Sequence, residues 1–138
     1  MNTASPPEQP APLFIDRDAW SNALDAALRG NGVQFVAHKD VFADDSKDVE
    51  WIARVSAEGW IGITRDKNIR TRANEIAMIR ASKAMICVFT SGNLSATATA
   101  ETLVKALPRI FERWRHRDRP VVYSIHRDGT LSSLSLKE

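Results

Sequence analysis

Apolar residues alternate along this chain between short runs and stripes at helical spacing. Short runs typical of buried strands occur at residues 13–15, 33–36, 60–64, 85–89, 121–125 and 131–136. Helical stripes lie between them, the first made by Trp20, Ala23, Leu24, Ala27 and Leu28. Further helices are predicted over residues 48–58, around Glu75–Ile79 and along Leu103–Trp114. Strands separated by helices predict an α/β fold whose mostly parallel sheet is covered on both faces.

Turn and packing residues refine this outline. Gly30 and Gly32 are expected to end the first helix and Gly59 the second, and the polar, acidic stretch after residue 36 is predicted to be a loop. Asp128-Gly129 predicts a tight turn, so the last two strands should form a C-terminal hairpin. Trp51 and Trp60 lie in apolar periodic segments, so we expect them to pack between helix and sheet.

Composition limits the chain to one folded unit. Its 138 residues are 43% hydrophobic, enough for a single core, and the net charge of +2 gives no general basic field. Residues 1–12 include four prolines and are predicted to be a flexible tail before one domain at 13–138. Cys87 lies in an apolar run and is expected to be a buried thiol. No apolar segment reaches the ~18 residues of a membrane span and no signal peptide is recognisable, so a cytoplasmic protein is expected.

Three aspartates lie where the predicted strands end or where a connection returns to the sheet. Asp16 follows the first strand directly, Asp66 follows the strand at 60–64 closely, and Asp48 opens the helix before that strand. Ligands of open parallel sheets bind beyond the carboxyl ends of the strands, so these carboxylates are expected to converge. Such a cluster favours a hard cation such as Mg²⁺, and without metal their mutual repulsion should raise the pKa of at least one.

Each aspartate also has a purely structural role open to it. Asp16 or Asp18 could cap the first helix and Asp48 the second, because Asp is a favoured N-cap residue. Asp66 could close an Asx-turn. The spacing of these residues does not decide between such roles and metal binding.

The segments around the aspartates resemble those of PIN-like nucleases. The matching segments are Phe14-Ile15-Asp16, Asp48–Ile52 and Glu58–Asp66: an apolar strand ends in Asp, an Asp opens a mid-chain helix, and a strand ends in Thr-Arg-Asp. The continuation is similar to the VapC-type toxin branch in Lys67–Arg70, Glu75 and Gly92-Asn93. The similarity covers about residues 13–134.

The resemblance implies a Rossmann-like three-layer α-β-α sandwich that binds Mg²⁺ or Mn²⁺. The implied activity is hydrolysis of RNA phosphodiester bonds by a metal-activated water, as the toxin of a toxin–antitoxin pair. Carried over by position, Asp16, Asp48 and Asp66 are the catalytic residues and metal ligands. RNA and a cognate antitoxin protein are the implied partners, no membrane is involved, and a homodimer is left open.

One position departs from the family pattern. Many PIN-like domains have a fourth acidic residue after the strand that follows Thr-Arg-Asp, where this chain has Asn93. An amide offers a carbonyl oxygen but no charge, which puts a second metal in question. Glu75 and Asp18 are the candidates for the missing carboxylate.

Basic residues near Asp66 suit a substrate that carries phosphates. Arg65, Lys67, Arg70 and Arg72 flank Asp66, and the first three, together with Asn93, are the candidate substrate-binding residues. A second basic cluster occupies residues 109–119 at the end of the long helix. There we favour interaction with the helix dipole over RNA contact, because it requires no partner.

Two other functions stay open. A PIN-like fold without the fourth acid can bind nucleic acid or protein without cutting. Asp16-Arg17-Asp18 also suits an Asp-dependent phosphatase in which Asp16 forms a phospho-enzyme, although such enzymes normally add a Thr or Ser and a Lys downstream. Metal-dependent RNA cleavage without a covalent intermediate distinguishes the first function from both.

Overall fold

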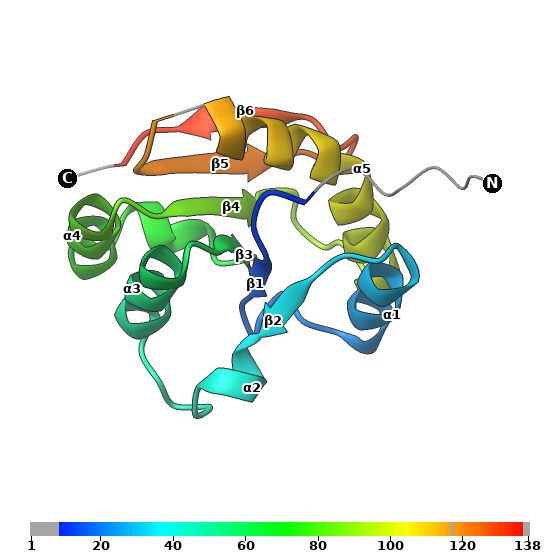
Figure 1. Ribbon diagram of the computed structural model, residues 1–138, viewed down its shortest axis with the longest axis horizontal. Helices are drawn as coiled ribbons and strands as arrows, with labels where there is room; N and C mark the ends of the chain where they lie inside the picture. Colours follow the sequence, from blue (N-terminus) through cyan, green and yellow to red (C-terminus); the bar gives the residue numbers. More distant parts are fainter. Residues whose placement is uncertain (1–8, 117, 137–138) are drawn as a thin grey trace.

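Helices and strands alternate along the chain, as the computed structural model shows for residues 9–116 and 118–136 (Figure 1). In chain order they are β1 (Leu13–Ile15), α1 (Asn22–Gly30), β2 (Phe35–Ala37), α2 (His38–Val41), α3 (Asp48–Glu58), β3 (Ile61–Thr64), the 3-10 helix η1 (Lys67–Arg70), α4 (Ala73–Ser82), β4 (Met85–Phe89), α5 (Ala96–His116), β5 (Val121–Ile125) and β6 (Leu131–Leu134). The first eight residues of the predicted tail lie outside the described residues.

The strands form one sheet in the order β2-β1-β3-β4-β5-β6. Every neighbouring pair is parallel except β5 and β6, which pair antiparallel at the edge. Their turn uses Gly129 at φ 87°, where an added Cβ would lie 2.8 Å from the Cβ of Lys105. The predicted mostly parallel sheet with a C-terminal hairpin at one edge is confirmed.

Helices cover both faces of the sheet, which gives the expected three layers (Figure 1). Alternate strand residues point to opposite faces, so each strand supplies two cores. Leu13, Ile63 and Cys87 belong to the core beneath α1 and α5, while Phe14 and Val88 belong to the core beneath α3 and α4. The burial of both strand faces explains why the sequence showed continuous apolar runs.

Aromatic side chains fix α3 on the sheet. Trp51 is fully buried, and its ring centroid lies 5.4 Å from that of Phe14. Trp60 stacks on Phe14 at 5.9 Å. Beneath Trp51, a Cβ added to Gly62 would lie 3.2 Å from the indole ring. The predicted packing of both tryptophans is confirmed, as is the buried thiol of Cys87, whose pKa burial raises to about 12.

Two segments differ from the sequence prediction. Residues 9–12, assigned to the tail, contact the sheet: the Gln9 amide bonds both backbone groups of Gln34 at 2.8 Å, and Pro12 O accepts from Ile61 N at 2.9 Å. The predicted loop after β2 begins with α2, four residues that are too few to show a helical period. His38 opens this helix and is 1% exposed. Within the described residues, no helix is both long and apolar enough to cross a membrane.

Candidate functional site

Asp16 is held where β1 ends, against the end of β3. Its backbone N–H donates to Ile63 O at 2.9 Å, which continues the pairing of the two strands. The side chain accepts from the Thr64 hydroxyl at Oδ2 and from the Arg17 backbone N–H at Oδ1, both at 2.8 Å. Asp16 is 3% exposed, and none of the ion pairs between described residues involves it. A buried carboxylate is therefore fixed at the carboxyl end of the sheet by neutral donors.

The Thr64 hydroxyl also joins Asp16 to Asp18. Its Oγ1 lies 2.8 Å from Oδ2 of Asp16 and 3.2 Å from Oδ1 of Asp18, and it accepts from the backbone N–H of Asp66 at 3.1 Å. Asp18 Oδ1 accepts a second bond from Arg65 N at 3.0 Å. A hydroxyl has one proton, so Thr64 cannot fully satisfy two charged carboxylates.

These surroundings raise the pKa of Asp16 to about 7. Burial is the largest cause, the charge of Asp18 the next, and the charge of Asp48 a smaller one, while the bonds from Thr64 and Arg17 oppose the shift. The direction agrees with the sequence prediction, but the principal cause is loss of hydration rather than repulsion.

Three other carboxylates converge on Arg72. Its Nη1 lies 2.6 Å from Asp66 Oδ2, 2.8 Å from Glu75 Oε1 and 3.6 Å from Asp48 Oδ2. Nη2 makes a further bond of 3.1 Å to Asp66 Oδ1, so the pairing with Asp66 is bidentate. The hydrogen bonds to Asp66 and then Glu75 raise the pKa of Arg72. Arg72 therefore supplies the positive charge at the centre of these acids.

The alternative structural roles are met at only one of these aspartates. Ser21 caps α1, accepting from Leu24 N at 3.0 Å, so neither Asp16 nor Asp18 has that role. The N-cap of α3 is Lys47, and Asp48 instead accepts from the Trp51 indole N–H at 2.9 Å. The predicted cap role of Asp48 is therefore wrong. Asp66 does make the side-chain bond of the predicted Asx-turn: at the N-cap of η1 it accepts from Asn68 N at 3.1 Å.

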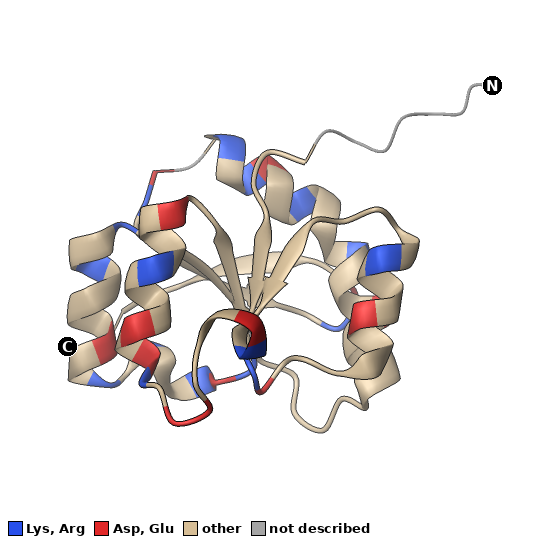
Figure 2. Cartoon of the chain, turned by 60° about the horizontal axis from the view of Figure 1, so that its bottom comes forward, with Lys and Arg blue, Asp and Glu red and all other residues tan. Residues whose placement is uncertain are grey.

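A polar groove of about 440 Å³ runs beside the Arg72 group. It is lined by Arg17, Asp45, Ser46, Lys47, Asp48, Val49, Arg72, Asn74 and Glu75. Acidic segments follow the loop between α2 and α3, with basic segments near them (Figure 2). The groove therefore has acidic side chains that could bind a metal ion and basic side chains that could bind an anionic substrate.

The carboxylates fit a hard divalent cation in their chemistry but are divided in their arrangement. All the candidate ligand atoms are carboxylate oxygens, which Mg²⁺ prefers. The Arg72 guanidinium already lies among three of these carboxylates as a cation. Across the described ranges, however, no three acidic, histidine or cysteine side chains lie close enough to hold one ion. Asp16 is grouped with Asp18, whereas Asp48 and Asp66 are grouped around Arg72, so the predicted trio does not share one coordination sphere in this arrangement.

The candidate substrate-binding residues differ in how far they are already engaged. The Arg65 guanidinium donates to Leu94 O at 3.2 Å and to the hydroxyl of Thr99 at 3.4 Å, which ties β3 to the start of α5. Arg70 donates to Ser135 O at 3.3 Å. Lys67 is exposed, and so is Asn93, which adopts the left-handed φ of 61° that Asn tolerates well.

The second basic cluster is largely used in packing, and Arg117 lies outside the described residues. Arg109 donates to Gly129 O at 3.3 Å, Arg113 lies over the ring of Tyr123, and Arg119 lies over that of Trp114. These contacts give the three side chains a structural role, through the hairpin turn and aromatic rings, whereas the predicted interaction with the helix dipole stays a prediction.

Sequence reasoning did not assign two residues of this site. Thr64 was recognised only as part of the Thr-Arg-Asp block, although a polar residue ending a buried strand beside an aspartate was a usable signal. Arg72 was grouped with the flanking cations, although it precedes Glu75 by three residues, a spacing that pairs side chains on a helix.

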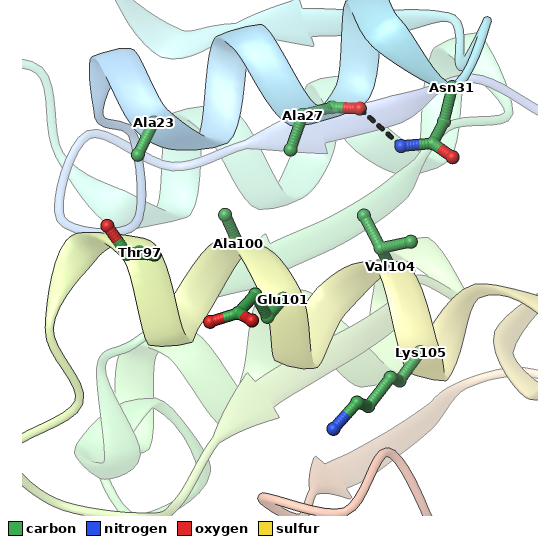
Figure 3. A pocket seen from close by; sticks show the side chains of 8 residues that line it. All are labelled: Ala23, Ala27, Asn31, Thr97, Ala100, Glu101, Val104 and Lys105. Atoms are coloured by element: carbon green, nitrogen blue, oxygen red, sulfur yellow. Dashed lines mark hydrogen bonds between the residues drawn. The ribbon is translucent and has the colours of Figure 1, made fainter.

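A second groove, of about 410 Å³, lies between α1 and α5. Ala23 and Ala27 face Ala100 and Val104 across it (Figure 3). Asn31, Thr97, Glu101 and Lys105 also line it, and it shares no lining residue with the groove beside Arg72.

The fold and the acids at the carboxyl ends of its strands define the class of protein. The sequence model of the PIN-like domain family matches residues 12–91, more than half of the chain, which therefore belongs to that family. The chain is also similar to a Mycobacterium tuberculosis protein named "Putative ribonuclease VapC45". The two are 25% identical over 118 residues, covering 83% of this chain and 85% of the relative. No solved structure matches the chain significantly.

Proposed function

We propose that this protein is a metal-dependent endoribonuclease that acts as the toxin of a toxin–antitoxin pair. The observation that carries the proposal is the buried Asp16 carboxylate, joined through Thr64 to Asp18 at the carboxyl end of the sheet. Keeping the buried Asp16 ionised beside a second carboxylate is costly unless a cation is bound in the working state. The mycobacterial relative's name, "Putative ribonuclease VapC45", supports RNA as substrate, and the resemblance to VapC-type toxins supports an antitoxin as partner.

Asp16, Asp48 and Asp66 are the proposed metal ligands, with Glu75 or Asp18 as the added carboxylate. A bound Mg²⁺ or Mn²⁺ would supply an activated water and neutralise charge on the phosphodiester. In the protein itself, Thr64 orients Asp16 and lowers its pKa, and Trp51 holds Asp48 by its indole N–H. The exposed Lys67 is the proposed contact to backbone phosphate.

Binding without cutting is the second candidate function. It is favoured by the division of the acids into two groups, since no three described side chains are arranged around a common ion. The phosphatase alternative has less support: its nucleophile would be Asp16, whose 3% exposure leaves little room for attack on a phosphate ester.

Incubation of the purified protein with a mixed RNA pool tests the proposal. We expect cleavage with Mn²⁺ or Mg²⁺, none with EDTA, and none for Asp16→Asn. Asp25→Asn is the control, because Asp25 makes only a surface pair with Arg29 on α1. An Asp16→Asn variant as active as the wild type would refute the assignment, and RNA binding without cleavage under every metal would favour the second function.

A further inference from the structure

Arg72 holds together carboxylates from three separate segments. Asp48 opens α3, Asp66 follows β3, and Glu75 lies in the first turn of α4. Their side chains are 24%, 19% and 11% exposed, so water shields them incompletely from one another. Three negative charges at such spacing require a counter-charge, and in this arrangement the Arg72 guanidinium provides it.

We propose that Arg72 is an internal counter-ion that a divalent metal must displace before Asp48 and Asp66 can bind it. The inference rests on the proposed function, because it assumes that these acids are metal ligands. Metal binding and withdrawal of the guanidinium are then parts of one equilibrium.

Displacement is required because the guanidinium cannot lose the positive charge that repels a metal ion. Arginine stays protonated in proteins, so relief of its repulsion toward a metal has to come from movement. Asp66 is engaged through both of its oxygens, at 2.6 and 3.1 Å, which leaves its carboxylate committed to Arg72. While Arg72 holds it in this way, Asp66 has no oxygen free of the guanidinium to offer an ion.

The position of Arg72 permits that movement. It is the N-cap residue of α4 but makes no side-chain cap bond, so withdrawal of its side chain breaks no capping bond of the helix. The side chain is 44% exposed and lines the groove of about 440 Å³, where a withdrawn guanidinium stays solvated. Arg17 and Lys47 line the same groove, so a released Arg72 would add to the positive charge facing it.

A counter-ion role predicts opposite effects on the fold and on metal affinity. Removing the guanidinium leaves the acids uncompensated, so the metal-free protein should become less stable. The same change removes the competitor, so a divalent ion should bind more tightly. A residue with only a structural role would lower stability without tightening metal binding.

Calorimetric titration of the full-length protein with MnCl₂ separates these cases. We expect Arg72→Gln to bind Mn²⁺ roughly ten-fold more tightly than the wild type, the scale expected from losing one to two partly exposed ion pairs. Arg72→Lys, which keeps the charge but not the bidentate pairing, should lie between them. Arg54→Gln is the matched control: Arg54 is 43% exposed and pairs with Glu58 within α3. It should bind like the wild type.

Unchanged or weaker Mn²⁺ binding by a folded Arg72→Gln variant would overturn the inference. RNA cleavage by the wild type with Mn²⁺ would in that case leave the proposed function standing. Absence of both Mn²⁺ binding and cleavage in every variant would remove the two together. If Arg72→Gln does not fold, Arg72→Lys decides: binding no tighter than that of the wild type counts against the counter-ion role.

Discussion

The Thr64 hydroxyl donates to Oδ2 of Asp16 at 2.8 Å and so links the ends of two neighbouring parallel strands. Thr64 is fully buried, and Asp16 nearly so. A hydrogen bond to a charged, dehydrated carboxylate is stronger than one between neutral groups, so this contact matters to both the fold and the ionisation of Asp16.

Replacing Thr64 by Val, which has nearly the same shape, tests that contact. Loss of the bond should raise the pKa of Asp16 further and destabilise the metal-free protein by about 1–3 kcal/mol at pH 8. The cost should shrink at pH 5, where Asp16 is largely protonated. Urea unfolding at both pH values, in EDTA, measures the difference. An equal loss of stability at pH 5 and pH 8 would show that the hydroxyl serves packing rather than the charge.

The raised pKa of Asp16 also sets the pH dependence of the metal-free fold. The pKa is about 7 in the folded state, above the unfolded value of about 3.9, so the unfolded chain loses this proton first. The resulting contribution to stability is fully present below about pH 4 and is lost as the pH rises through 7. We expect this group alone to lower the free energy of unfolding by on the order of 2–4 kcal/mol between pH 4 and 8.

Asp16→Asn isolates that contribution. The variant should be more stable than the wild type at pH 8 without metal, and it should show a flatter dependence on pH. Asp25→Asn is the control, because a surface pair such as that with Arg29 contributes at most about 1 kcal/mol. Denaturant unfolding at several pH values would contradict the assignment if Asp16→Asn lost stability at pH 8.

The sequence predicted the fold well because both strand faces are buried. Runs such as Met85–Phe89 are continuous only in a sheet covered on both sides, and they alternate with helices of clear period. The short helix α2 was not predicted because four residues show no helical period. The contact of Gln9 with Gln34 was not predicted because it joins residues far apart in the chain.

The candidate site could be predicted from the sequence only in part. Asp16 and Asp66 follow strands, so topology alone places them at one edge of the sheet. Which acid pairs with which partner depends on side-chain geometry instead. Arg72 pairs with Asp66 through two bonds, and the Thr64 hydroxyl is shared by two aspartates. The distances of these contacts, 2.6–3.2 Å, cannot be read from any pattern along the chain.

The two cations that flank Asp66 should contribute differently to RNA binding. Lys67 is exposed, whereas Arg65 is tied to Leu94 and Thr99. We expect Lys67→Gln to weaken binding of single-stranded RNA and to reduce the salt dependence of log K by about 0.7 for one lost phosphate contact. Arg65→Gln should instead lower stability by about 1 kcal/mol and leave that slope unchanged. Fluorescence anisotropy across a salt series measures the salt dependence of RNA binding for both variants. A reduced slope for Arg65→Gln alone would reverse the assignment.

The last prediction concerns the acid that the family pattern places at Asn93. If an amide replaces a carboxylate there, the site has one negative charge fewer, and a second cation binds weakly. RNA cleavage should then rise late with metal concentration and should favour Mn²⁺, which accepts a less charged set of ligands than Mg²⁺. Asn93→Asp should shift half-activation to lower metal concentration, measured as initial cleavage rate against free Mn²⁺.

Glu75 offers the competing position. It is 8% exposed and bound to Arg72 at 2.8 Å, close to Asp66 through their shared partner. If Glu75 supplies the fourth carboxylate, Glu75→Gln should abolish cleavage while Asn93→Asp leaves the metal dependence unchanged. Thermal unfolding of Glu75→Gln is the necessary control, because breaking its pair with Arg72 costs stability as well. Loss of activity in a variant that is still folded at the assay temperature would assign the position to Glu75. The left-handed conformation of Asn93 would then be sufficient reason for an asparagine in its loop.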